Sequence, residues 1–104
     1  LDLTHPLCFG FSTKRQALFK NSTITMNVNG SVTHYPVKYT AKPLMAGYAS
    51  ANNIASIAGK AAVAAHSVGK GRVVAFADVA AFRGFWLGSE RFMANALLFG
   101  RLIE

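Results

Sequence analysis

The stretch of sequence that decides the fold is AAVAAHSVGKGRVVAFAD, residues 61–78. It holds two apolar runs, residues 61–68 and 72–78, which are joined by the short segment Gly69-Lys70-Gly71. Glycines in a short connection between two apolar runs are typical of a β-hairpin. Both runs are continuously apolar rather than alternating, so we expect both faces of this hairpin to be covered.

Helices are predicted on both sides of this hairpin. Residues 49–58 predict the first, with Ser50 as its N-cap and Gly59 at its end. Residues 89–102 predict the second, with Ser89 as its N-cap. The wide apolar face of the second helix consists of Phe92, Met93, Ala96, Leu97, Phe99 and Ile103. Its narrow polar stripe consists of Arg91, Asn95 and Arg101. Such a helix packs against a sheet or between other elements, which indicates an α/β domain.

A second hairpin is predicted nearer the N-terminus. Residues 22–27 are rich in β-branched side chains, and the dipeptide Asn29-Gly30 favours a tight turn because both residues tolerate positive φ. The return strand would contain Val32, His34 and residues 36–39. Because Pro36 cannot donate a ladder hydrogen bond, we expect this strand to be an edge strand or to be interrupted.

The composition is that of a folded domain. The chain has 104 residues and a formal net charge of +7, yet only 14% of its residues are charged and 52% are hydrophobic. The positive balance comes from scarce acids rather than abundant bases, which excludes a disordered basic tail. No apolar run approaches the roughly 20 residues that a membrane span needs.

The turn of the first hairpin, GKGR at residues 69–72, shares its glycines and lysine with phosphate-binding loops. A P-loop, however, needs the longer pattern Gly-x-x-x-x-Gly-Lys-Ser/Thr between a strand and a helix. An apolar run follows here, so we predict a hairpin turn. The other basic residues are spread singly along the chain, so no nucleic-acid groove is indicated.

Little catalytic chemistry is visible. The three histidines lack the spacing of metal ligands, and Cys8 is the only cysteine and lies in an apolar run, where we expect a small buried thiol. No two acids are close in sequence, so no acid–base pair is predicted. The acids are Asp2, Asp78, Glu90 and Glu104. We therefore assign no catalytic, cofactor-binding or metal-binding residue in this chain.

The densest candidate site follows the first hairpin directly. Asp78 ends the second apolar run, and an aromatic-rich turn, residues 79–88, leads into the last helix. Arg83 could form an ion pair with Asp78 and stack on Phe82 or Trp86. We therefore take these four side chains as candidate structural or interaction residues. A lock on the strand-to-helix connection is the favoured interpretation, and a ligand or partner platform is the alternative.

Taken together, residues 69–78, 82–86 and 95–100 resemble the C-terminal end of large bacterial zinc-carboxypeptidase-like proteins. The segments 5–11 and 47–50 also fit. In those proteins a domain similar to class I glutamine amidotransferases follows the peptidase domain. The resemblance implies an α/β fold for residues 1–104: the C-terminal portion of an amidotransferase-like fold, with a mixed sheet, hairpins and a C-terminal helix. The chain would be a single domain or a fragment cut from a larger one.

The resemblance also implies a function without catalysis. An amidotransferase needs a cysteine on an elbow and a His-x-Glu pair, and neither pattern occurs here. We expect a noncatalytic accessory domain that packs against, orients or helps to assemble the peptidase. Its partner would be the upstream peptidase domain of the same chain, which would hold the zinc, or a second copy of the chain. The resemblance points to a periplasmic or secreted bacterial protein. The scattered basic residues, for their part, indicate no nucleic-acid partner.

Two alternatives from other classes stay open. The first is a small basic module that binds a polyanionic partner, which the net charge of +7 favours. The second is a remnant amidohydrolase in which folding brings a histidine close to Cys8.

Overall fold

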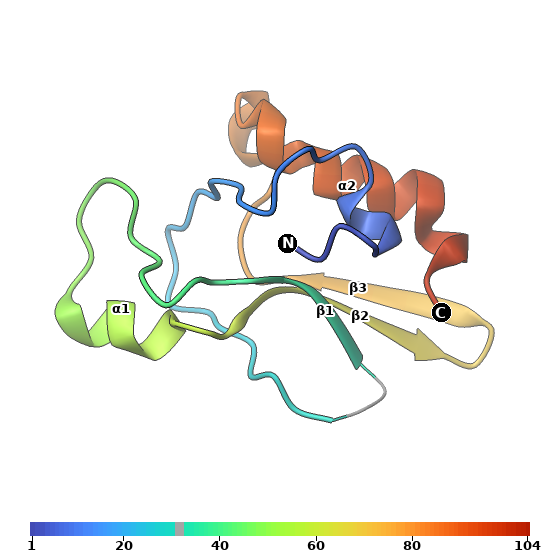
Figure 1. The fold of residues 1–104 in the computed structure, drawn as a ribbon, viewed down its shortest axis with the longest axis horizontal. Coiled ribbons are helices and arrows are strands. Elements are labelled where there is room, and N and C mark those ends of the chain that lie inside the picture. The colour runs from blue at the N-terminus through green and yellow to red at the C-terminus, as the bar shows by residue number, and fades with distance from the viewer. Residues whose placement is uncertain (31–32) are drawn as a thin grey trace.

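The computed structural model, which describes residues 1–30 and 33–104, is a small α/β domain built on a three-stranded antiparallel sheet (Figure 1). The strands, in the sheet order β1-β2-β3, are Thr33–Lys38, Ala61–Val68 and Gly71–Phe76. The helices are α1 (Ala51–Ile57) and α2 (Leu87–Phe99), with short 3-10 helices η1 (Pro6–Cys8), η2 (Phe82–Gly84) and η3 (Gly100–Leu102). All strand pairs among the described residues are antiparallel, so the expected mixed sheet is wrong.

The hairpin predicted from residues 61–78 is confirmed. β2 and β3 pair in register, with Ala65 opposite Val74 on the face that packs against the core. Gly69 makes the turn at φ +58°, a left-handed conformation that glycine adopts without steric cost. The opposite face of β3 is uncovered, because Val73 is 54% exposed. The expectation that both faces of the hairpin are covered is therefore wrong for β3.

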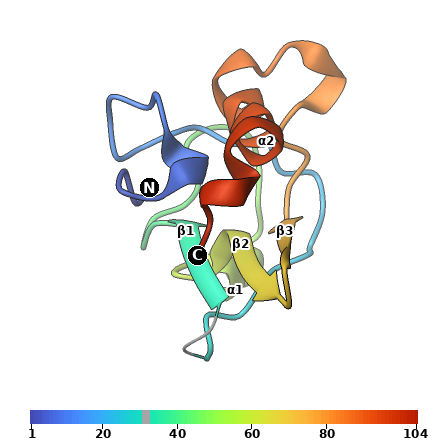
Figure 2. The same cartoon turned by 90° about the vertical axis from the view of Figure 1, so that its right-hand side faces the viewer.

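The hydrophobic core lies between α2, η1 and one face of the sheet. Figures 1 and 2 show α2 and the N-terminal segment on the same side of the strands. Phe92 is fully buried there and stacks on Phe11 with 4.5 Å between ring centroids. The buried cluster consists of Leu7, Cys8, Val37, Ala62, Val63, Ala65, Phe92 and Ile103.

The second predicted hairpin is wrong in its first strand. Residues 22–27 form no strand, and Met26 makes only an isolated bridge to Ala61. β1 pairs instead with β2, where Val37 faces Val63. The predicted residue Val32 lies outside the described residues. The edge position expected from Pro36 is confirmed, because β1 is an edge strand and its register shifts between His34 and Lys38.

The predicted helix at residues 49–58 is confirmed as α1. The Ser50 hydroxyl accepts a hydrogen bond from the backbone N–H of Asn53 at 3.2 Å, as an N-cap should. Gly59 follows the helix at φ +73° and turns the chain into β2. α1 buries no residue fully and contributes no side chain to the buried cluster.

The start of α2 differs from the prediction. The helix begins at Leu87, with Trp86 in the N-cap position, so Ser89 is not the cap. Ser89 is instead fully buried inside the first turn, and its hydroxyl donates a hydrogen bond of 2.5 Å to the carbonyl of Ala80. This contact fastens the start of α2 to the segment that leaves β3.

The predicted polar stripe of α2 is also wrong in one residue. Asn95 is buried, and its side-chain amide donates to the carbonyls of Leu7 at 2.8 Å and Phe9 at 2.9 Å. A polar side chain therefore sits on the inner face of α2 because it satisfies carbonyls at η1. Leu97 and Leu98, which face away from the buried Phe92, are 80% and 74% exposed.

Candidate functional site

Asp78 stands at the centre of a buried polar cluster. Its side chain is 3% exposed, and its carboxylate lies 2.8 Å from the ammonium group of Lys20. The hydroxyl of Tyr39 donates to the other carboxylate oxygen at 2.5 Å. Lys20 also donates to the carbonyl of Ile24 at 2.6 Å. We call Asp78, Lys20 and Tyr39 the polar lock, because they join the end of β3, the end of β1 and the loop before β1.

The predicted ion pair between Asp78 and Arg83 is wrong. Arg83 is exposed at the surface, and its guanidinium lies 5.7 Å from the ring centroid of Phe82. The predicted stacking on Phe82 is thus confirmed, whereas the carboxylate is taken by Lys20. Arg83 has φ +53°, which is uncommon for a residue other than glycine and marks the sharp bend of η2.

The aromatic turn is anchored by a residue that the sequence reasoning missed. Phe19 contacts Phe82, with 4.3 Å between ring centroids, and Trp86, at 5.7 Å. Phe85 also approaches Phe82, at 5.9 Å, but is largely exposed. Phe19 and Lys20 are consecutive in the chain, so one short segment contacts both the aromatic turn, through Phe19, and Asp78, through Lys20. The arrangement fits the predicted lock, with the loop at residues 19–20 as its second half.

Nothing in the local pattern marked these missing partners. Lys20 is 58 positions from Asp78 in the chain and Tyr39 is 39 positions away. Neither lies in a motif with a fixed spacing to the acid. The only hint in the sequence is the position of Asp78 at the end of an apolar strand, because a carboxylate that is buried there needs a cationic partner.

Cys8 has the surroundings of an inert thiol. It is buried in η1, and its sulfur donates to the carbonyl of Pro36 at 3.7 Å. Burial raises the pKa of the Cys8 thiol, which disfavours the nucleophilic thiolate. The nearest histidine in sequence, His5, uses its Nδ1 to accept the backbone N–H of Leu7 at 3.2 Å. Burial also lowers the pKa of His5, so that the imidazole tends to be neutral.

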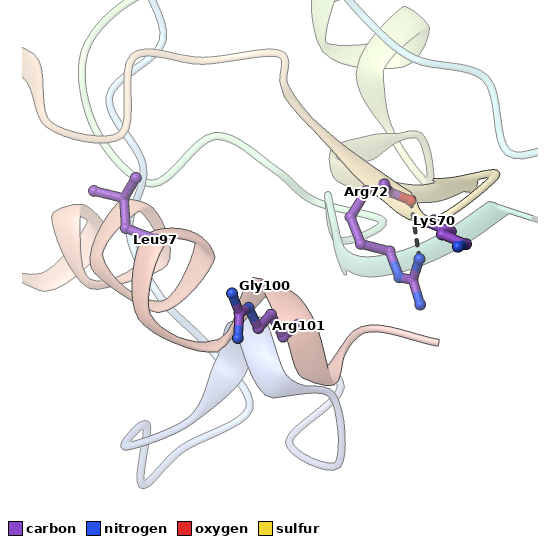
Figure 3. Close-up of a pocket in the computed structure, with 6 residues that line it drawn as sticks. Lys70, Arg72, Leu97, Gly100 and Arg101 are labelled. Atoms are coloured by element: carbon purple, nitrogen blue, oxygen red, sulfur yellow. Dashed lines mark hydrogen bonds between the residues drawn. The ribbon is translucent and has the colours of Figure 1, made fainter.

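A hollow of about 480 Å³ opens between the β2–β3 turn and the end of α2 (Figure 3). Three cationic side chains border it, and none of them forms an ion pair with an acid within the described part of the chain. We call it the cation-lined hollow. Its lining consists of Lys70, Gly71, Arg72, Leu97, Gly100 and Arg101.

Searches for similar proteins found nothing. Models of protein families, curated proteins and solved structures each returned no match to this chain. Over residues 1–30 and 33–104, no helix has the length and apolar character to cross a membrane. The same residues contain no group of three or more His, Cys, Asp or Glu side chains placed to hold a metal ion.

The polar lock gives a pH-dependent prediction for Tyr39. Burial and the hydrogen bond to Asp78 raise the pKa of the Tyr39 phenol above its ordinary value of 10.0. A group whose pKa is raised by folding stabilises the fold below its unfolded pKa and loses that contribution as the pH rises. We therefore expect the unfolding free energy of the parent protein to fall more steeply above about pH 10 than that of Tyr39→Phe.

Urea unfolding of both proteins between pH 7 and pH 11 measures this difference. Lysines titrate in both proteins, so the gap between the two curves isolates the phenol. At pH 7 the gap should be about 1.5–3 kcal/mol, the value of a hydrogen bond to a charged group. Curves that stay parallel above pH 10 would contradict the prediction.

Proposed function

We propose that this chain is a noncatalytic accessory domain that packs through α2 against another domain of the same polypeptide. One observation carries the proposal: the side of α2 that faces away from the core is rich in leucine. Leu87, Leu97 and Leu98 are 69%, 80% and 74% exposed. We call these three residues the docking face.

The burial of a leucine side chain is worth about 1.5–3 kcal/mol. A helix that is apolar on all sides is normally buried on all sides. In this chain the core and η1 cover only the inner face of α2, through Phe92 and Asn95. The docking face is therefore suited to contact with a second body, as large exposed apolar patches generally are.

The charge distribution favours a different domain over a second copy as the partner. Arg91 and Arg101 are exposed on α2 and η3, and the whole chain carries a net charge of +7. Two copies that met through their docking faces would bring these like charges together, which opposes association. A domain with acidic residues around an apolar surface would be attracted instead.

The resemblance of residues 69–100 to the tail of zinc-carboxypeptidase-like proteins supports an upstream peptidase domain as that partner. In this proposal the chain is the C-terminal portion of an amidotransferase-like domain. Zinc and catalysis belong to the peptidase domain, and this chain positions that domain. The buried Cys8, with its raised thiol pKa, fits a domain without cysteine catalysis.

Two measurements test the proposal. The coding sequence upstream of Leu1 should encode a peptidase domain with a zinc-binding motif. The isolated chain should release no C-terminal amino acid from peptides, with or without added zinc. Zinc-dependent cleavage by the isolated chain, lost on chelation, would overturn the proposal, and so would an upstream sequence without such a motif.

The docking face makes a prediction about surface behaviour. Leu97→Lys with Leu98→Lys should leave the unfolding free energy within about 1 kcal/mol of the parent value, because both side chains are already exposed. The double variant should bind less of an apolar fluorescent dye than the parent protein does, because two exposed apolar side chains are replaced by charged ones. Val68→Lys, at an exposed position at the end of β2, is the matched control. An equal effect of the control would argue against a specific docking face.

A further inference from the structure

We propose that the cation-lined hollow binds a compact ligand with two anionic groups, a diphosphate or a dicarboxylate. This inference does not rest on the proposed function, although Leu97 belongs both to the docking face and to the lining of the hollow. It rests on three unpaired cations that two separate parts of the fold bring to one concave site. Lys70 and Arg72 come from the β2–β3 hairpin, and Arg101 comes from η3.

The positions of the cations favour a ligand with two charges. Figure 3 shows Lys70 and Arg72 on the hairpin side of the hollow, and Arg101 together with Leu97 on the helix side. A single small anion would contact one side at a time. Two linked anionic groups can contact both sides at once and so gain from the effective concentration that the link provides.

Arg72 is oriented before any ligand arrives. Its Nη1 donates to the carbonyl of Gly71 at 2.9 Å, and its Nε donates to the carbonyl of Ile103. A guanidinium has five N–H donors, so further donors remain for an oxyanion. A side chain that is already held in place loses less conformational entropy on binding. Arginine also matches the geometry of carboxylate and phosphate oxygens better than lysine does.

The electrostatic balance of the hollow is positive. The end of α2 contributes a partial negative charge of about half an elementary charge, which one cation offsets. Lys70, Arg72 and Arg101 together supply three positive charges, and no acid in the described residues pairs with them. Asp78 is not available to them, because Lys20 and Tyr39 occupy its carboxylate.

The hollow has room for such a ligand. Its volume of about 480 Å³ lies within the range of small-molecule sites. Gly100 lines it without a side chain, and a Cβ atom added there would meet no other atom within 4 Å. Its backbone conformation is helical, so other residues can occupy this position without strain. Gly100 can therefore be replaced to fill the hollow without a change of charge.

The glycine-rich turn thus acquires a function that its sequence did not predict. GKGR, residues 69–72, joins two strands and forms no P-loop. The cationic side chains of this turn nevertheless line the same hollow as Arg101, which lies near the C-terminus. The three cations line one hollow rather than a groove along the surface. This arrangement favours a compact anion over the long backbone of a nucleic acid.

Amide chemical-shift titrations of the complete chain at low ionic strength test the proposal, with pyrophosphate, citrate and a single-stranded oligonucleotide as probes. We expect saturable shifts at Lys70, Gly71, Arg72, Gly100 and Arg101 with pyrophosphate or citrate. Tighter binding of pyrophosphate would identify a phosphate ligand, and tighter binding of citrate would identify a carboxylate ligand. Shifts that do not saturate, or saturable shifts only with the oligonucleotide, would overturn the proposal.

Three variants sharpen this experiment. Gly100→Leu should weaken binding at least tenfold by filling the hollow, and Arg101→Gln should do so by removing a charge. Lys42→Gln is the charge-matched control and should change affinity less than twofold, because Lys42 lies in the segment between β1 and α1 and does not line the hollow. Arg101 is exposed, so its variant keeps the test decisive even if Gly100→Leu disturbs the helix end. Equal losses in Arg101→Gln and Lys42→Gln would overturn the proposal by showing a nonspecific charge effect.

Discussion

Asp78→Asn should lower the free energy of unfolding by about 3–5 kcal/mol, a large part of the 5–15 kcal/mol that stabilises a typical domain. The substitution keeps the shape of the side chain and removes its charge. Lys20, whose side chain is 17% exposed, would then lie in the polar lock without a counter-charge. The hydroxyl of Tyr39 would lose an ionised acceptor at the same time. Urea unfolding at pH 7 measures the loss.

A comparison of double variants shows which cation matters. If Lys20 is the partner, Lys20→Met should cost much less in the Asp78→Asn background than alone, because the two residues are coupled. Arg83→Gln should add independently to Asp78→Asn, because Arg83 lies over Phe82 and not against the carboxylate. Glu90→Gln, which changes an acid outside the polar lock, should cost about 0.5 kcal/mol or less. An Asp78→Asn loss as small as this control would contradict the polar lock.

The elements that depend on local chemistry could be predicted from the sequence. The hairpin of β2 and β3 follows from two apolar runs around glycines, and α1 follows from the Ser50 cap and Gly59. The strand predicted at residues 22–27 failed for a tertiary reason. Met26, in the middle of this segment, bridges to Ala61 at the start of β2 instead of pairing along β1, whose outer edge stays without a partner strand among the described residues.

The candidate site was predicted only in part, and the reason is also tertiary. Sequence reasoning identified Asp78 and the aromatic turn but chose Arg83, the nearest cation in the chain. The actual partner, Lys20, reaches the carboxylate because Phe19 packs on the aromatic turn. Such a pairing over 58 positions has no signature in a single sequence. The cation-lined hollow escaped notice for the same reason, because it joins residues 70–72 to Arg101.

The orientation of α2 could not be read from its sequence, because the helix is apolar on nearly every side. Asn95 decides it. Its amide donates to the carbonyls of Leu7 and Phe9, and this contact fixes the inner face and leaves Leu97 and Leu98 outside. Asn95 is the one of these residues whose side-chain amide bridges α2 to the N-terminal segment, which makes it an informative position for substitution.

Asn95→Asp should lower the free energy of unfolding by about 3–5 kcal/mol at pH 7, because a carboxylate cannot donate and would lie against two carbonyl oxygens in a buried site. Burial and the carbonyls should raise the pKa of the new carboxyl above its unfolded value of about 3.9. A carboxyl whose pKa is raised by folding destabilises the fold least when it is protonated. The loss in unfolding free energy should therefore shrink as the pH falls toward 4. Asn95→Leu also leaves the two carbonyls unpaired but adds no charge. The loss in unfolding free energy of Asn95→Leu should therefore be independent of pH. A loss that is independent of pH in Asn95→Asp as well would show that the amide is not buried against η1.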